Sequence, residues 1–163
     1  MVTEYHAKGS IGDLINKTNR INSGGIKGLK SADCRLYLID MLKALYYCHK
    51  TIKVIHRDIK PDNIMINHNN EAVLIDFGVS TLVDMQEDDI MGKNMGTYMF
   101  YSPEMFKNAG VKNQVRGEKT DIWALGITFY YMLTGTYPHE PKDVFDLRHK
   151  ITNGIFNWNK IAN

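Results

Sequence analysis

The sequence predicts a mainly α fold (α+β in class), in which a helical bundle carries small β-hairpins. Three observations predict it. Apolar residues recur at helical spacing between positions 31 and 50. Positions 120–133 are apolar on most faces, as in a helix buried at the centre of a domain. Positions 63–75 hold two short apolar runs around a polar turn, which is typical of a hairpin.

Composition limits the classes of function. The chain has 163 residues, of which 44% are hydrophobic and 23% charged, an ordinary globular balance. A net charge of +2 is too small to indicate nucleic-acid binding, and no apolar run approaches the roughly 18 residues of a membrane helix. Cys34 and Cys48 lack a paired CxxC spacing, so we expect free buried thiols in a reducing compartment. The predicted location is cytoplasmic, with the nucleus as the alternative.

The first third of the chain predicts a strand end, a loop and a long helix. Residues 1–5 have strand character, and the Asn-, Gly- and Ser-rich stretch 17–30 predicts a loop. Ser31 is expected to cap a helix that ends near His49 and Lys50, with Asp33 in its first turn. The expected buried stripe of this helix is Cys34, Leu38, Met41, Leu42, Leu45 and Cys48.

The middle and end of the chain predict a hairpin and two further helices. Val54–Ile55 is expected to be a short buried strand, and the hairpin has strands at 63–67 and 72–75. A long segment follows as far as Glu104. The central helix 120–133 is expected to end at Gly135 and Pro138, and 144–151 predicts an amphipathic helix.

One constellation of polar residues points to chemistry. The hairpin returns Asp76 to the side of Asn63, and Asp58 lies shortly before both. Oxygen donors of this kind suit Mg²⁺ that is shared with phosphate. A further carboxylate beside such a metal can orient a hydroxyl nucleophile. In an extended loop Lys60 points to the same side as Asp58, where its charge can neutralise a transferring phosphoryl group.

Four motifs in order carry a family resemblance: His56-Arg57-Asp58-x-Lys60-x-x-Asn63, Asp76-Phe77-Gly78, Gly96-Thr97 through Ser102-Pro103-Glu104, and Asp121-x-Trp123-x-x-Gly126. The chain resembles the C-terminal lobe of a eukaryotic protein kinase of the serine/threonine type, from residue 1 to about 158. The narrower likeness is to the calcium/calmodulin-dependent kinase kinase group. The resemblance implies that 1–163 is an incomplete kinase domain without its N-lobe. Its implied parts are a hinge at 1–7, a catalytic loop at 56–63, an activation segment at 76–104 and a central helix at 120–133.

The resemblance also implies a role for each motif residue. Asp58 would be the base that orients the substrate hydroxyl, and Lys60 would stabilise the γ-phosphate of ATP. Thr97 would hydrogen-bond to Asp58 and Lys60 and thereby favour hydroxyl substrates. Asn63 and Asp76 would hold Mg²⁺. The implied partners are ATP and a protein substrate with serine or threonine, together with a regulatory partner that the sequence does not identify.

Further implied contacts surround the nucleotide and the loop. The backbone of Glu4 and His6 would hydrogen-bond to adenine. Thr3 would lie at the back of the adenine pocket and Met65 would form its floor. Ser10, near Asp13, would contact ribose. Asp121 would accept backbone hydrogen bonds from His56 and Arg57, and the His56 ring would pack behind Phe77.

Two features of the activation segment lead to expectations. The stretch 82–96 has no Ser or Thr but holds Glu87, Asp88 and Asp89. One hypothesis is that a carboxylate of this cluster replaces a phosphate opposite Arg57, and an ordinary solvated acidic loop is an equal alternative. Glu104 has no evident partner within 163 residues, so it is expected to be a buried unpaired carboxylate.

Two functions stay open from the sequence. The first is a serine/threonine protein kinase, active in its complete form, that transfers the ATP γ-phosphate to a protein hydroxyl. The alternative is a non-catalytic kinase-like binding module or an inactive truncated fragment, because the Gly-rich phosphate loop and its lysine are not in this sequence.

Overall fold

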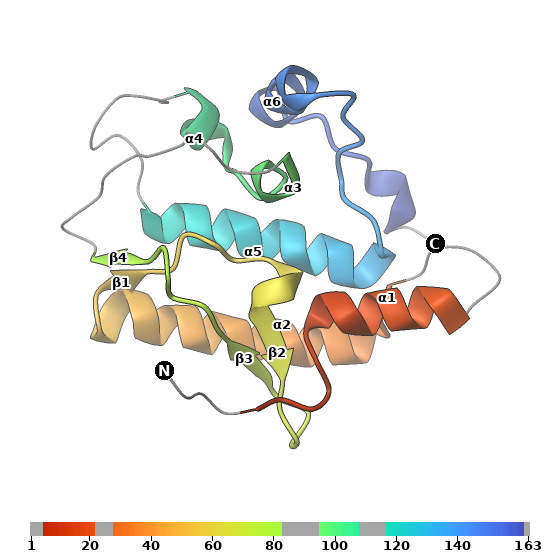
Figure 1. Cartoon of the computed structure of the whole chain (residues 1–163). Helices are drawn as coiled ribbons and strands as arrows, with labels where there is room; N and C mark the ends of the chain where they lie inside the picture. Colours follow the sequence, from red (N-terminus) through yellow and green to blue (C-terminus); the bar gives the residue numbers. More distant parts are fainter. Residues whose placement is uncertain (1–4, 22–27, 83–94, 108–116, 162–163) are drawn as a thin grey trace.

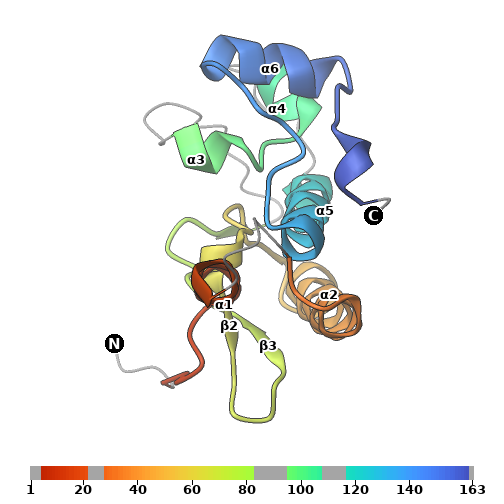
Figure 2. The same ribbon diagram turned by 90° about the vertical axis from the view of Figure 1, so that its right-hand side faces the viewer.

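The protein is described here from a computed structural model, which describes residues 5–21, 28–82, 95–107 and 117–161. The central element is helix α5 (Gly117–Thr134). Helix α2 (Ser31–Tyr46) packs along one side of α5, with α1 (Ile11–Ile21) and the strands nearby. On the opposite side of α5 lie α3 (Met95–Tyr98), α4 (Pro103–Lys107) and α6 (Val144–Thr152), as Figures 1 and 2 show. The mainly α fold class is confirmed.

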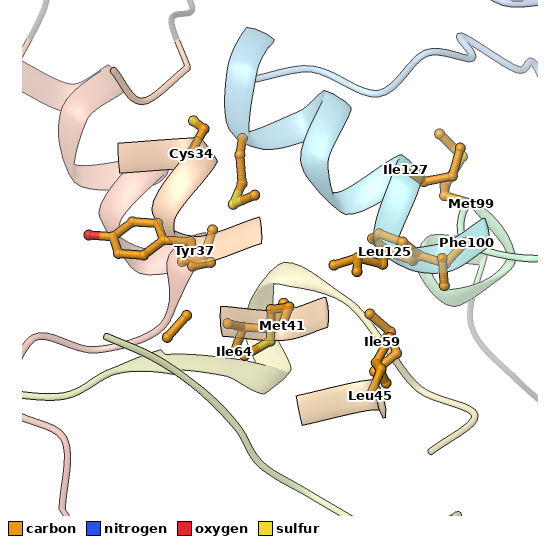
Figure 3. Close-up of a cluster of buried hydrophobic side chains, with 14 of the residues drawn as sticks. Cys34, Tyr37, Met41, Leu45, Ile59, Ile64, Met99, Phe100, Leu125 and Ile127 are labelled. Atoms are coloured by element: carbon orange, nitrogen blue, oxygen red, sulfur yellow. The ribbon is translucent and has the colours of Figure 1, made fainter. Parts of the chain in front are cut away.

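The core fills the space on both sides of α5. Figure 3 shows side chains from α2, from residues 59–64 and from α5 converging, with Met99 and Phe100 on the side of α5 away from α2. All of the side chains labelled there are at most 7% exposed: Cys34, Tyr37, Met41, Leu45, Ile59, Ile64, Met99, Phe100, Leu125 and Ile127. Because α5 buries residues on most of its faces, it forms the centre of the core.

The predicted hairpin is confirmed. Strand β2 (Ile64–Ile66) pairs antiparallel with β3 (Ala72–Leu74), with Ile64 opposite Leu74. A second small sheet joins the predicted strand β1 (Val54–Ile55) to β4 (Thr81–Leu82), also antiparallel. The β1–β4 pair holds the segment that follows Asp76 against the segment that precedes Asp58.

The prediction of a loop over 17–30 is wrong for its first part. Helix α1 runs to Ile21, because Ser10 and Asp13 cap its start and Ile11 and Ile15 are fully buried one turn apart. Lys17, which contributed to the prediction of a loop, lies on the exposed face of this helix together with Arg20. Tyr5, the described end of the predicted strand, lies in no strand, whereas residues 1–4 lie outside the described residues.

Three details of α2 also differ from the prediction. The N-cap is Lys30, whose backbone is extended, and Ser31 is the first helical residue. Leu42 was expected in the buried stripe but is 44% exposed, since it lies one residue past the stripe formed by Met41 and Leu45. After Tyr46 the chain continues as a π-helical turn, η1 (Tyr47–Thr51), and not as α-helix up to His49.

The later helices match their predictions closely. Helix α5 extends the predicted 120–133 by three residues at its start and one at its end, and Gly135 ends it with φ 72°. Helix α6 begins after Asp143, whose carboxylate accepts the N–H of Asp146 at 2.8 Å. The chain continues to the short 3₁₀ turn η3 (Trp158–Lys160). Within the described residues, no helix is both long and apolar enough to cross a membrane.

Candidate active site

The catalytic-loop candidates converge on the carboxylate of Asp58. Lys60 Nζ lies 2.6 Å from Asp58 Oδ2, and Asn63 Nδ2 lies 2.9 Å from that oxygen and 2.9 Å from the Asp58 backbone oxygen. The side chains of Asp58 and Lys60 are only 14% and 24% exposed. Solvent screening is therefore reduced, and one carboxylate oxygen is held by a cation and an amide together.

Asn63 reaches this position through a 3₁₀ turn. Pro61 begins η2 (Pro61–Asn63), where its fixed φ suits a helical turn, and Asn63 N–H donates to Lys60 O at 3.0 Å. The next residue enters β2, so the turn and the hairpin share a boundary at Asn63. The side chain of Asn63 is 6% exposed.

The hairpin brings Asp76 next to Asn63, as predicted from the sequence. Ile75 N–H donates to Asn63 O at 3.0 Å, which extends the β2–β3 pairing by one bond. Asp76 follows directly in the left-handed region, at φ 63°, and its Oδ1 accepts Gly78 N–H at 3.1 Å. A non-glycine residue in this conformation costs on the order of 1–3 kcal/mol, so the surrounding contacts fix it.

The oxygens of Asn63 and Asp76 fit a magnesium site that is shared with a ligand. The amide nitrogen of Asn63 is used by Asp58, which leaves its carbonyl oxygen as a donor to a cation. The Asp76 carboxylate is exposed. Among the described residues there is no group of three or more His, Cys, Asp or Glu that could hold a metal. Mg²⁺ commonly takes one or two protein oxygens and completes its shell with phosphate and water, which is the set offered here.

His56 ties the two loops together. Its Nδ1 accepts Asp58 N–H at 3.3 Å and its Nε2 lies 2.9 Å from Ile75 O. Since a carbonyl oxygen only accepts, Nε2 carries the hydrogen in this arrangement. The ring also meets Phe77 edge-on at 4.7 Å, so the prediction that His56 packs against Phe77 is confirmed.

Asp121 holds the backbone of the loop from below, at the start of α5. Its two oxygens accept His56 N–H and Arg57 N–H, each at 2.9 Å, as predicted. The carboxylate is 1% exposed, and a buried charge of this kind is stable only when hydrogen bonds compensate its lost hydration. A third donor, His49 Nε2 at 2.8 Å, was not predicted. The sequence could have indicated this contact, because His49 lies four residues after the buried Leu45 and so falls on the same side of the chain in a helical turn.

Thr97 lies on the same cavity as Asp58 but is not hydrogen-bonded to it. The cavity, of about 40 Å³, is bounded by the loop, the start of α5 and the α3–α4 segment. Among the contacts of the described residues, Thr97 makes no hydrogen bond to Asp58 or Lys60, so its expected role stays a prediction.

Glu104 is half-buried, which corrects the expectation of a fully buried carboxylate.

The predicted nucleotide contacts are only partly within the described residues. Ser10 forms an isolated bridge with Met65, and Ile66 N–H donates to Gly9 O at 3.0 Å, so the N-terminal segment lies against β2. The Ser10 backbone N–H donates to the Asp13 carboxylate at 2.9 Å and the Ser10 hydroxyl donates to it at 3.0 Å, and both bonds lower the pKa of that carboxyl.

The remaining nucleotide candidates are placed as follows. Ser10 is 5% exposed and its hydroxyl takes part in the helix cap, and its contact with ribose stays a prediction. His6 is buried, and its backbone oxygen accepts Gly9 N–H at 3.0 Å. Thr3, Glu4 and the acidic cluster at 87–89 lie outside the described residues, so the predictions that rest on them stay predictions.

Comparison with known proteins decides the family. The family model described as "Protein kinase domain" matches residues 1–163. The chain belongs to the protein kinase family. Among curated proteins of this family, it is 35% identical over 157 residues to CBL-interacting protein kinase 25 of Oryza sativa subsp. japonica, covering 96% of this chain and 29% of that protein. It is 32% identical over 143 residues to mitogen-activated protein kinase kinase 1 of Arabidopsis thaliana, covering 88% and 36%.

A human protein kinase is similar to this chain over nearly the same stretch. NUAK family SNF1-like kinase 1 of Homo sapiens is 31% identical over 156 residues, covering 96% of this chain and 21% of that protein. The chain therefore spans between about a fifth and about a third of the length of these kinases. The narrower likeness to calcium/calmodulin-dependent kinase kinases is not confirmed by these relatives.

Proposed function

We propose that this chain supplies the catalytic loop of a serine/threonine protein kinase, which transfers the γ-phosphate of ATP to a protein hydroxyl. The observation that carries the proposal is the contact of Asp58 Oδ2 with both Lys60 Nζ and Asn63 Nδ2. Asp76 lies close to this cluster, because the residue before it, Ile75, is hydrogen-bonded to the backbone of Asn63. Phosphoryl transfer depends on positioning and charge neutralisation, and this cluster provides both.

The chemistry follows from the charges. Asp58 accepts the proton of the substrate hydroxyl as the oxygen attacks phosphorus, and Lys60 offsets the charge on the transferring phosphoryl oxygens. Asn63 and Asp76 are the residues that would hold Mg²⁺, which, when bound, neutralises the β- and γ-phosphates.

Serine or threonine is the proposed acceptor. Lys60, two residues after Asp58, is the pattern of the serine/threonine-specific group, and one relative is named as a CBL-interacting serine/threonine-protein kinase, at 31% identity over 159 residues. The alternative of a non-catalytic kinase-like binding module is the outcome that the experiment below separates from catalysis.

The test is transfer from γ-labelled ATP with Mg²⁺ to a generic basic protein substrate, using the full-length protein. We expect label on serine and threonine and not on tyrosine. Asp58→Asn is expected to lower kcat by roughly 10²- to 10⁴-fold, the usual contribution of a general base. The nucleotide Kd should change little, because in the proposed role Asp58 would contact the substrate hydroxyl and not the nucleotide.

The matched control is Glu71→Gln, which removes an exposed carboxylate at the far turn of the hairpin. It should leave kcat unchanged. Equal rates for Asp58→Asn and the unmutated protein would refute the assignment of Asp58. Nucleotide binding without any transfer by the unmutated protein would favour the binding module.

A further inference from the structure

The C-terminal end of α6 places the pair Asn153–Gly154 in an exposed helix cap. Asn153 is the C-cap residue, and Gly154 follows it in the left-handed region at φ 65°. The Gly154 N–H donates to Ile151 O at 3.2 Å. The next N–H, that of Ile155, donates to Lys150 O at 2.9 Å. These two bonds together define a Schellman cap, in which glycine commonly takes the left-handed position.

The same pair is chemically labile. Asn153 is the one asparagine of the sequence that is followed by glycine. Asparagine is among the thermolabile residues, because the backbone nitrogen of the next residue can attack the carbon of its side-chain amide. Glycine has no Cβ, so the backbone at Gly154 can approach that carbon with little steric hindrance. The sequence therefore directs this reaction to position 153.

The closed cap keeps the two reacting groups apart. The Asn153 side-chain amide donates from Nδ2 to His149 O at 2.8 Å, and the Gly154 N–H is used by Ile151 O. The backbone of Asn153 has ψ 6°, which turns the Gly154 nitrogen away from the side chain. A five-membered ring can form only after rotation about this bond, so both hydrogen bonds must break first.

The surroundings of the cap permit that rotation. Asn153 and Gly154 are exposed, and a Cβ built at Gly154 would meet nothing within 4 Å. The bond from Gly154 N–H to Ile151 O, at 3.2 Å, is at the long end of the normal range. Helix ends open at a far lower free energy than the core does. The cap can therefore open while the buried side chains of α6, Leu147 and Ile151, stay in place.

We propose that Asn153 is a modification site, at which the native protein loses the side-chain amide through opening of the α6 cap alone. The Gly154 nitrogen bonds to the side-chain carbonyl carbon of Asn153. The bond from that carbon to the amide nitrogen breaks, and ammonia leaves with the proton of the attacking N–H. Water then opens the resulting succinimide on one side to give aspartate, or on the other to give isoaspartate. The reaction does not depend on the proposed function.

The product places a negative charge at the end of α6 that disfavours it. A carboxylate at 153 would set an oxygen opposite His149 O in place of the present N–H donor. It would also meet the partial negative charge of the helix C-terminus. The nearest cation in the last turn is already engaged, since Lys150 Nζ lies 2.6 Å from Glu140 O and 2.8 Å from Asp146 Oδ2. Modification should therefore loosen the end of a helix that packs against α3 and α4.

The first experiment follows the unmutated full-length protein under native conditions at neutral pH. Trypsin releases residues 151–160 as one peptide, which carries Asn153 together with Asn157 and Asn159 as internal controls. Fragment mass spectra should show conversion at 153 at least roughly tenfold faster than at 157 or 159, because only Gly154 lacks the hindering Cβ. Both aspartate and isoaspartate should form. Equal conversion at the three positions, or aspartate without isoaspartate, would overturn the proposal.

A second experiment distinguishes opening of the cap from global unfolding. Gly126→Ala changes the interior of α5, where a Cβ meets nothing within 4 Å, and leaves α6 untouched. If the reaction required global unfolding, the added stability would slow conversion at 153 by roughly twofold to fivefold. Opening of the cap alone predicts an unchanged rate. A rate that falls with the gain in global stability would overturn the proposed route.

A third experiment tests the consequence with two variants of matched shape. Asn153→Asp carries the charge of the product, whereas Asn153→Gln keeps a neutral amide. Hydrogen–deuterium exchange of the peptide that covers 149–155 should quicken by roughly twofold to tenfold in Asn153→Asp, from the loss of one hydrogen bond and the unfavourable charge. Asn153→Gln should quicken it less. Exchange that is equal in the two variants would refute the effect of the charge on the end of α6.

Discussion

A glycine-to-alanine pair tests the packing around α5 most sharply, because the same chemical change should have opposite effects at two sites. Gly28 lies against the end of α5, where Leu29 N–H donates to Met132 O at 2.7 Å. A Cβ at Gly28 would lie 2.1 Å from Leu133 O and 2.4 Å from Met132 O. These are rigid backbone atoms, so the two segments must move apart by more than 1 Å to restore an ordinary contact.

The expected cost has two parts. Overpacking of this kind costs about 1–3 kcal/mol, and weakening the Leu29 hydrogen bond costs about 0.5–1.5 kcal/mol. Gly28→Ala should therefore lower the free energy of unfolding by about 1.5–4.5 kcal/mol. For a chain of this size that corresponds to a decrease in Tm of roughly 3–18 °C.

Gly126→Ala is the matched comparison. Gly126 lies inside α5 and a Cβ there would meet nothing within 4 Å. Alanine in a helix interior is more favourable than glycine by about 0.5–1 kcal/mol, so Tm should rise by roughly 1–4 °C. Thermal unfolding followed by circular dichroism measures both. A Gly28→Ala protein as stable as the unmutated one would refute the close approach of 28–29 to α5.

Two further predictions concern titratable groups. Burial raises the pKa of the Cys34 thiol to about 11 from the ordinary 9.0. Alkylation of Cys34 at pH 8 should therefore be at least about a hundredfold slower in the folded than in the unfolded protein. Mass spectrometry of the alkylated protein measures both rates. The same shift means that the unfolded thiol ionises first, and the free energy of unfolding should fall between about pH 9 and pH 11. Burial lowers the pKa of His139, so the unfolded state binds the proton more readily and stability should fall as the pH drops below 6.5; urea unfolding of His139→Gln should show a smaller decrease.

The sequence was informative where side-chain pattern and backbone pairing agree. The hairpin could be predicted because a polar turn separates two apolar runs, and from it followed the proximity of Asn63 and Asp76. The length of α5 was also predictable, since few positions between 120 and 133 are polar. In both cases one local signal is sufficient to determine the element.

The missed features depend on contacts that no local pattern contains. Helix α1 was hidden because its outer face has the composition of a loop, and only the burial of Ile11 and Ile15 distinguishes it. The π turn has no composition signal, and the partners of its residues His49 and Lys50 lie on α5, far away in the sequence. The reciprocal cap between Ser10 and Asp13, which starts α1, was also missed, because the stretch before residue 17 was considered only for its nucleotide contacts.

The same reasoning explains why the candidate site needs so much of the chain behind it. Arg57 and Asp76 are both left-handed, at φ 68° and 63°; Arg57 directly precedes the proposed base Asp58, and Asp76 is itself a residue that would hold the metal. Their combined conformational cost is on the order of 2–6 kcal/mol, a large part of the stability of an ordinary domain. Asp121 offsets it at Arg57 through a buried hydrogen bond, and the His56–Ile75 contact offsets it beside Asp76. Because these supports come from α5 and from the loop itself, α5 and the loop must form together for Asp58, Asn63 and Asp76 to converge.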